Sequence, residues 1–312
     1  MSEPGFRHVP VLLGETLAAL APRPGGDYLD GTAGGGGHSE AILLAMEGRG
    51  TLTLMDRDPQ ALRASRERLS AHPNVSFIHG NFHDARELLE GRLFDGILLD
   101  LGVSSPQLDT PERGFSYHED APLDMRMDQS AGMTAADWLN GTPEREITQA
   151  LYDYADERWA ARIAKTIAAM RAQKPFETTR DLVDAVDRAI PKAVRRKDEG
   201  HPARRTFQAV RIAVNEEIAP LPRALEDLVM MLRPGGRLCV ISFHSIEDRA
   251  VKHTLRRLKD PCVCPPDAPV CVCGKQPLVS LPKGYPAAPT EEELAANPRS
   301  RSALLRVAQR LP

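Results

Sequence analysis

The sequence predicts an α/β fold in which a mostly parallel sheet carries helices on both faces and an all-helical segment interrupts the sheet. Three observations predict it. Short apolar runs alternate with segments of helical spacing up to residue 102, strand signals then disappear after Leu108, and the alternation resumes at residue 232. A chain of 312 residues can form a core domain of about 200 residues and a smaller second domain.

The first part of the chain contains four strand-length apolar runs separated by helical segments. Because the runs are almost continuously apolar, both faces of the sheet should be covered by helices. Each intervening segment begins at a polar turn, such as the Asp58-Pro59 pair. The predicted strands span residues 28–32, 51–56, 75–80 and 94–102.

The middle of the chain has helical periodicity only. Thr142 is predicted to cap a helix with Pro143 in its first position. Two further helices should bury one face each, over 159–170 and over 207–218, with Ile218 on the apolar face of the second. We therefore predict a core domain formed by 1–107 and 213–312, and a helical insert over 108–212.

The α/β pattern returns in the last third of the chain. Pro234-Gly235-Gly236 is predicted to turn the chain into a strand at 238–243, and a helix should follow. A proline-rich stretch at 261–298 then leads to a last strand at 303–310. This stretch should form a surface excursion with at most one short strand, at 277–282.

Bulk properties exclude several classes of protein. The formal net charge of −3 disfavours a generally basic nucleic-acid binder, although a local basic patch remains compatible with it. No apolar run is long enough to span a membrane, and five cysteines fit a reducing compartment better than a disulfide framework. A cytoplasmic protein is therefore expected.

A glycine-rich loop, "GTAGGGG" at 31–37, follows the first strand and opens a helix. Such a turn lets the backbone approach a nucleotide-like ligand, and we expect Gly34, Gly36 and Gly37 to serve this approach. The dinucleotide pattern GxGxxG fails because Ser39 stands in its last place, which weakens a nicotinamide or flavin interpretation. Plain turns and caps are the structural alternative.

Polar groups follow the neighbouring strands as well. Asp56 ends the second strand, where a carboxylate accepts hydrogen bonds from ribose hydroxyls of NAD or S-adenosylmethionine alike. "GNFHD" follows the third strand, and Asp100 with "LGVSSPQ" ends the fourth. Together these groups would surround an adenosine.

The chain resembles the bacterial 16S rRNA (cytosine-N4)-methyltransferase family, RsmH, formerly MraW. The resemblance rests on blocks that run in order along nearly the whole chain, among them "HVPVLLGETL" (8–17), "DGTAGGGGHS" (30–39), "GILLDLGVSSPQLD" (96–109), "RGFSY" (113–117), "PLDMRMD" (122–128), "HPARRTFQAVRIAVNEE" (201–217), "GGRLCVISFHSIEDR" (235–249) and "NPRSRSALLRVA" (297–308). It departs from the family at Ala33 and Gly35, where relatives often carry bulkier residues.

The resemblance implies a class I methyltransferase that uses S-adenosyl-L-methionine to methylate the N4 amine of one cytidine in the decoding region of 16S rRNA. The substrate would be this RNA within the 30S subunit or a late precursor. By the same resemblance, the cofactor contacts fall on Gly36, Gly37, His38, Asp56, Phe82, Asp100 and Gln107.

An exocyclic cytosine amine is a weak nucleophile, so positioning it matters more than a strong base. We expect Asp100 or a backbone carbonyl of 101–105 to accept the amine hydrogen bonds, with "SFHS" (242–245) as the opposite wall. His244 is a candidate catalytic residue. The equally weighted alternative is a strand-end histidine bonded to its neighbours.

The densest positive cluster lies in the predicted insert, at 191–205. Beside a methyl-donor site it is predicted to bind RNA phosphates, whereas a solvated surface is the alternative. Phe115 or Tyr117 could support a flipped base, although core packing is the simpler role for both. The candidate RNA-binding residues are Lys192, Arg195, Arg196, Lys197, Arg204 and Arg205.

Four cysteines, Cys262, Cys264, Cys271 and Cys273, form two CxC pairs within the proline-rich stretch. They could surround one Zn²⁺, but free thiols are the favoured interpretation and no metal is predicted. Cys239 is expected in the core. Two other functions stay open: a nicotinamide-dependent dehydrogenase, and a non-catalytic RNA-binding or assembly factor.

Overall fold

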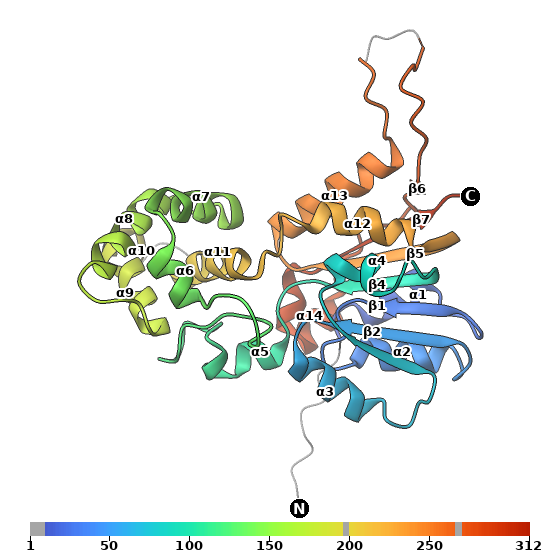
Figure 1. The fold of residues 1–312 in the computed structure, drawn as a ribbon, viewed down its shortest axis with the longest axis horizontal. Coiled ribbons are helices and arrows are strands. Elements are labelled where there is room, and N and C mark those ends of the chain that lie inside the picture. The colour runs from blue at the N-terminus through green and yellow to red at the C-terminus, as the bar shows by residue number, and fades with distance from the viewer. Residues whose placement is uncertain (1–9, 196–199, 266–269) are drawn as a thin grey trace, which may run out of the picture. The chain divides into compact units, whose positions relative to one another are not determined.

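The structure is a computed structural model that describes residues 10–195, 200–265 and 270–312 (Figure 1). The chain divides into two compact units. Unit 1 consists of Met1–Gly102 and Pro220–Pro312, and unit 2 of Val103–Ala219. The insert predicted from the sequence, 108–212, lies within unit 2 and is a few residues shorter at each end.

Unit 1 contains a seven-stranded sheet with strand order β3-β2-β1-β4-β5-β7-β6. The first five strands pair in parallel, and β7 is antiparallel to both β5 and β6. The predicted mostly parallel sheet is therefore confirmed. The strands are β1 (Asp27–Asp30), β2 (Thr51–Asp56), β3 (Val75–His79), β4 (Phe94–Asp100), β5 (Leu232–Ser242), β6 (Val279–Ser280) and β7 (Leu304–Arg310).

Helices cover both faces of this sheet, as the sequence predicts. Ile97 and Leu99 of β4 pack into one apolar cluster with residues of α12 and α13, whereas Leu98 packs into a second cluster with residues of α1, α2 and α3. Alternate side chains of a strand point to opposite faces, so both layers are apolar. The helices of unit 1 are α1 (Leu13–Leu20), α2 (Gly37–Ala45), α3 (Pro59–Arg68), α4 (Ala85–Leu88), α12 (Leu221–Met230), α13 (Ser245–Lys259) and α14 (Glu291–Ala296), with 3-10 turns η1 (Phe82–Asp84) and η3 (Pro298–Ser302).

Strand β5 begins earlier than predicted. Phe94 pairs with Leu232, yet Gly96 already pairs with Arg237, so the segment with Pro234-Gly235-Gly236 is an irregularity inside the strand rather than a turn before it. Gly235 adopts φ +83, which a residue with a Cβ rarely does. The segment predicted to be a turn is therefore a bulge, which bends the strand without ending it.

Unit 2 has an apolar core of its own, in which Ile163, Leu182 and Phe207 are buried. Among its described residues there is no named strand. Its helices are α5 (Ser105–Asp109), α6 (Ala135–Gly141), α7 (Glu144–Ala155), α8 (Ala160–Arg171), α9 (Thr179–Ala189), α10 (Lys192–Arg195) and α11 (Arg204–Asn215), with the 3-10 turn η2 (Pro111–Arg113).

Two helix ends in unit 2 differ from the expectation. Thr142 is the C-cap of α6, and Pro143 occupies the N-cap position of α7 rather than its first helical position. Helix α11 ends at Asn215 because Glu216 turns the chain with φ +50, which leaves Ile218 outside the helix.

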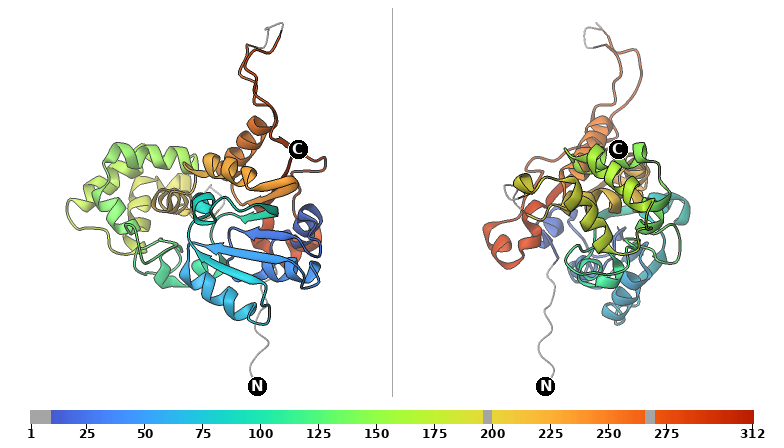
Figure 2. Two further views of the ribbon diagram at one scale, coloured as in Figure 1. Left: turned by 45° about the vertical axis from the view of Figure 1, so that its right-hand side comes forward. Right: turned by 90° about the vertical axis from the view of Figure 1, so that its left-hand side faces the viewer.

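The described part of the chain contains no helix that is both long and apolar enough to cross a lipid bilayer. The predicted surface excursion begins after α13: both views in Figure 2 show the described residues of 260–278 extending beyond the end of this helix.

Candidate functional site

Four acidic side chains lie where strands of unit 1 end. Asp30, Asp56 and Asp100 are the last residues of β1, β2 and β4, and Glu247 lies in the first turn of α13, just after β5. Because these strands are parallel neighbours, their carboxyl ends meet at one edge of the sheet. Asp100 lies close enough to Asp30 and Glu247 for their charges to affect its ionisation.

The glycine-rich loop between β1 and α2 is bonded to the neighbouring strands. The Gly34 N–H donates to Asp56 Oδ2 over 2.8 Å, and the Ala33 N–H donates to the Met55 carbonyl over 3.0 Å. On the other side, Thr32 Oγ1 accepts a hydrogen bond of 2.6 Å from the Asp100 N–H. These bonds fix the loop between the ends of β2 and β4.

The glycines of this loop serve two different purposes. A Cβ on Gly36 would lie 3.2 Å from Ser65 Cβ, and one on Gly37 would lie 2.6 Å from Pro10 Cγ, so these two glycines permit close packing within the protein. Among the described residues, a Cβ on Gly35 would meet nothing within 4 Å, and one on Gly34 would meet only the Thr32 carbonyl. The open side of the loop is therefore at residues 34 and 35, whereas the sequence pattern predicts a ligand approach at 34, 36 and 37.

Asp30 and Asp56 both accept hydrogen bonds from backbone or hydroxyl donors. Asp30 is 1% exposed and accepts hydrogen bonds from Ser39 Oγ (2.6 Å) and the Thr32 N–H (3.2 Å). Asp56 accepts one from Asp58 N–H on Oδ1, besides that from Gly34 on Oδ2. Burial nonetheless raises the pKa of each to about 6, because it disfavours the charged form.

The side chain of Asp100 has the fewest hydrogen-bond partners of the four among the described residues. Its Oδ1 is buried and has no hydrogen-bond partner among the described residues. His38 Nε2 lies 3.6 Å from Oδ2. Burial, and then the charges of Asp30 and Glu247, raise the pKa of Asp100 to about 8, while burial lowers the pKa of His38 to about 4. A neutral imidazole supplies no charge to balance the carboxylate, so a cationic ligand would be favoured here.

His244 is bonded to Glu247 through both ring nitrogens. Nδ1 accepts from the Glu247 N–H over 3.3 Å, and Nε2 lies 2.9 Å from Glu247 Oε1. This geometry assigns the proton to Nε2. Glu247 Oε2 in turn accepts from the Phe243 N–H over 2.9 Å. His244 therefore caps α13 and, with Phe243, positions a buried carboxylate.

The structure brings most of the predicted cofactor residues together. Gly36, Gly37, His38, Asp56, Phe82 and Asp100 all lie in unit 1 at or just after the ends of β1 to β4. Phe82 begins η1, and its ring meets that of His83 edge to face at 4.4 Å. Gln107 lies in unit 2, where its Oε1 accepts a 2.9 Å hydrogen bond from Ser104 N–H at the start of α5.

Sequence reasoning missed three groups at this edge. Asp30 ends a strand in the same way as Asp56 and Asp100, so the same rule would have found it. Glu247 is the third residue of a helix with a polar cap, which is the pattern of a capping box. Burial, and then the Arg57 charge, lower the pKa of His83 to about 4, and nothing in the sequence signals this.

The predicted RNA-binding residues lie in unit 2. Lys192 is exposed on α10, and Arg204 and Arg205 are exposed at the start of α11. Arg195 ends α10, whereas Arg196 and Lys197 lie outside the described residues.

The two aromatic candidates for supporting a base have different surroundings. Phe115 is 5% exposed and belongs to the core of unit 2. Tyr117 stacks on His201 with ring centroids 4.5 Å apart. Cys239 is fully buried in β5, as predicted.

Comparison with known proteins agrees with the resemblance noted in the sequence. The model of the MraW methylase family matches residues 5–311. A protein of Symbiobacterium thermophilum named ribosomal RNA small subunit methyltransferase H is 52% identical over 98% of this chain and 97% of its own length. A protein of the same name from Heliobacterium modesticaldum is 51% identical over 98% of this chain and 99% of its own.

Solved structures give weaker matches. A putative rRNA methylase from Clostridium thermocellum is 9% identical, with a TM-score of 0.46 over 97% of this chain and 100% of its own. An rRNA methylase from Streptococcus thermophilus is 11% identical, with a TM-score of 0.40 over 99% of this chain and 100% of its own. The assignment therefore rests on the sequence relatives and on the family model, whose match covers nearly the whole chain. Methylases of this kind take their methyl group from S-adenosyl-L-methionine. The chain belongs to the MraW methylase family.

Proposed function

We propose that this chain transfers a methyl group from S-adenosyl-L-methionine to the N4 amine of a cytidine in the decoding region of 16S rRNA, within the 30S subunit or a late precursor. Family membership and the names of the relatives support the reaction class and the RNA. One structural observation supports the site: the buried Asp100 Oδ1 has no hydrogen-bond partner among the described residues, and its carboxyl group lies close to two other acids.

The acids at the strand ends fit a cationic donor. S-adenosyl-L-methionine carries a positive sulfonium and a positive amino group, and either would offset the cost of ionising Asp100 beside Asp30 and Glu247. No described residue crowds the loop at glycines 34 and 35, so a ligand can approach its backbone there.

Asp56 is suited to hold a ribose diol. An ionised carboxylate has about four lone-pair sites, two on each oxygen. The Asp58 and Gly34 N–H groups occupy one site on Oδ1 and one on Oδ2, respectively. Each oxygen can still accept one hydroxyl, and the two backbone bonds hold the carboxylate in a fixed orientation.

The donor supplies an electrophilic methyl group on a positively charged sulfur. The chain's own task is to hold the weakly nucleophilic amine in line and to accept its hydrogen bonds. We assign these hydrogen bonds to Asp100 or to backbone carbonyls of 101–105. His244 acts on this edge through Glu247, to which both of its ring nitrogens are bonded, and is therefore a positioning residue in this proposal.

A nicotinamide-dependent dehydrogenase is disfavoured by the family and by one contact. Ser39, which stands where the dinucleotide pattern needs its third glycine, donates a 2.6 Å hydrogen bond to the buried Asp30. A non-catalytic assembly factor would not methylate RNA, so the experiment below distinguishes it from an enzyme.

The test is to map N4-methylcytidine in 16S rRNA from cells that lack the protein and from the same cells supplied with wild type or Asp100→Asn. We expect the modification to return at one decoding-region cytidine with wild type, and at least tenfold less of it with Asp100→Asn. Single-turnover assays on naked 16S rRNA and on purified 30S subunits would then identify the substrate form. Normal N4-methylation in cells lacking the protein would refute the proposal, as would methylation at a different atom.

A further inference from the structure

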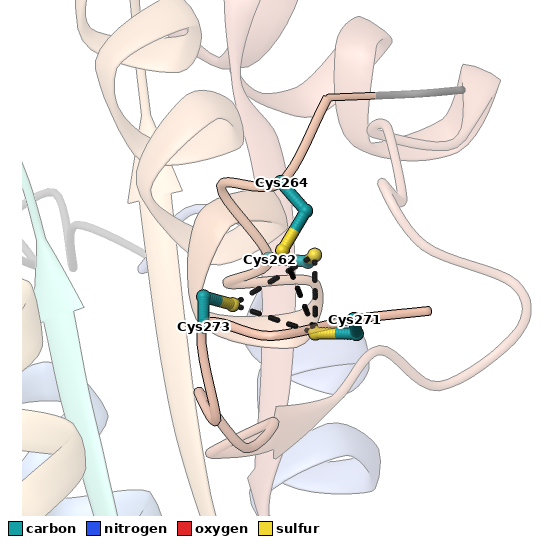
Figure 3. A group of neighbouring side chains, drawn as sticks. All are labelled: Cys262, Cys264, Cys271 and Cys273. Carbon is teal, nitrogen blue, oxygen red and sulfur yellow. Dashed lines mark hydrogen bonds between the residues drawn. The ribbon is translucent and has the colours of Figure 1, made fainter. Parts of the chain in front are cut away.

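Four cysteines outside the candidate site converge in one segment. The described residues between α13 and β6, 260–265 and 270–278, are here called the cysteine arm. Cys262 and Cys264 lie near its start and Cys271 and Cys273 near its end, and Figure 3 shows their sulfur atoms directed at one another. None of the four forms a disulfide.

Four of the six Sγ–Sγ distances are close to the edge length of a tetrahedral metal site. All four Sγ atoms lie within 4.8 Å of one another. Cys271 Sγ is 3.6 Å from that of Cys262, 3.8 Å from that of Cys264 and 3.5 Å from that of Cys273, and the Cys262–Cys273 distance is 3.8 Å. Four sulfur ligands at about 2.3 Å from one Zn²⁺ would be separated by about 3.8 Å.

Backbone N–H groups are directed at these sulfur atoms. The Val272 N–H donates to Cys264 Sγ over 3.3 Å. The N–H groups of Val263 and Lys275 are directed at Cys273, and that of Cys264 at Cys262. Gly274 follows the second CxC pair with φ +64, a backbone conformation that glycine adopts readily and that lets the chain turn back beside the sulfur atoms.

The arm has little else to give it a defined structure. Its described residues form no helix or strand. Three valines between or beside the cysteines are exposed, Val263 by 66%, Val270 by 70% and Val272 by 86%, so the arm has no apolar core at these positions. Segments of this size without a core are commonly held by disulfides or by a metal.

We propose that Cys262, Cys264, Cys271 and Cys273 bind one Zn²⁺ as four thiolates and that this ion fixes the shape of the cysteine arm. Binding releases the four thiol protons and leaves the site with a charge of about −2 when all ligands are ionised. Tetrahedral sulfur sets favour zinc or iron, and zinc needs no redox partner.

The ion would be structural. Four protein ligands leave no position for a substrate on a tetrahedral ion. In addition, α13 has fifteen residues and separates Glu247 near its start from the arm after its end, a span of about 20 Å at 1.5 Å per residue.

The test is elemental analysis of the full chain purified under reducing conditions without chelators or a histidine tag. We expect one equivalent of zinc per chain in the wild type and in Cys239→Ala, which removes a thiol outside the arm. The Cys264→Ser and Cys271→Ser variants should each retain at least tenfold less zinc. Binding of S-adenosyl-L-methionine by calorimetry should be unchanged in all of these proteins, which shows that they are folded and that the metal is not part of the donor site.

Replacing the ion with Co²⁺ reports the ligands directly, because tetrahedral thiolate cobalt has intense visible and sulfur-to-metal charge-transfer bands. We expect these bands in the wild type and their loss in Cys271→Ser. Less than a tenth of an equivalent of zinc in protein that binds the donor would overturn the proposal. So would one equivalent of iron in place of zinc, or a mass lower by the hydrogens of one or two disulfides.

Discussion

At the scale of single residues, Asp100 should link donor binding to pH. Its pKa is raised to about 8 by burial and by two neighbouring acids, so at pH 7 the free protein holds a proton that a bound cation would displace. We predict the release of up to about one proton on binding, and an affinity that rises from pH 6 to about 8 and then levels off. Calorimetry in two buffers of different ionisation enthalpy measures the proton count.

The matched variant is Asp100→Asn, which keeps the shape of the side chain and cannot ionise. Its proton release should fall to the small contribution of Asp30 and Asp56, whose pKa values are about 6. An unchanged proton count in Asp100→Asn would assign the titration to another group.

Two substitutions of His244 distinguish a positioning role of this side chain from a role in proton transfer. Asn is a good N-cap but has no imidazole, so His244→Asn should keep the start of α13, whereas His244→Ala should lose about 1 kcal/mol of unfolding free energy. Single-turnover methyl transfer should stay within about threefold of wild type in His244→Asn and fall further in His244→Ala. A loss of a hundredfold or more in both variants would instead show that the imidazole itself takes part in the reaction.

The sequence predicts individual site residues when their position follows from periodicity. Asp56 and Asp100 could be placed because each ends a strand of a parallel sheet, and Asp30 follows the same rule. The contact between His244 and Glu247 follows the local capping-box spacing, but the lack of a hydrogen-bond partner for Asp100 Oδ1 among the described residues, and the pKa of His83, depend on side-chain packing across several elements. No local pattern encodes these two features.

At the scale of elements, the glycine-rich loop gives a matched pair of substitutions. Gly36 has φ +76 and a Cβ there would lie 3.2 Å from Ser65 Cβ, whereas a Cβ on Gly35 would meet no described atom within 4 Å. We predict that Gly36→Ala lowers the unfolding free energy by about 1–3 kcal/mol, and that Gly35→Ala causes no loss. Urea denaturation of the donor-free proteins measures both.

If Gly35→Ala weakens donor binding without changing stability, the open side of the loop contacts the ligand. Equal destabilisation by the two substitutions would contradict the assignment of Gly36 to packing.

Element boundaries were predicted less well than the elements themselves. Every predicted strand forms, but β5 includes the Pro234-Gly235-Gly236 segment because the pairing with β4 continues on both sides of the irregularity. A proline-glycine sequence has the same local signal whether it turns the chain or bulges within a strand, so only the partner strand distinguishes the two.

At the scale of the whole molecule, the exposed basic residues of unit 2 should determine the salt dependence of RNA binding. Replacing Lys192, Arg204 and Arg205 with Ala should weaken binding and reduce the slope of log affinity against log salt by about 2–3, because a protein that neutralises fewer phosphates releases fewer counterions. Binding to a 16S rRNA fragment at several salt concentrations measures this slope.

The control is Arg145→Ala with Lys165→Ala, which removes exposed charge elsewhere in unit 2. Equal slopes for both sets would assign RNA binding to another surface.

Strands β4 and β5 are hydrogen-bonded neighbours in the middle of the sheet, yet the whole of unit 2 lies between them in the chain. During synthesis, β1 to β4 therefore emerge before β5, and the edge of β4 that pairs with β5 stays unpaired until the ribosome has produced β5. Unit 2 is one continuous, largely helical segment, so most of its contacts are local and should form quickly. Its early folding shortens the flexible chain that must close before β5 can pair with β4. Nascent chains that end before β5 should consequently be protected from proteolysis in unit 2 while the exposed edge of β4 is a target for chaperones.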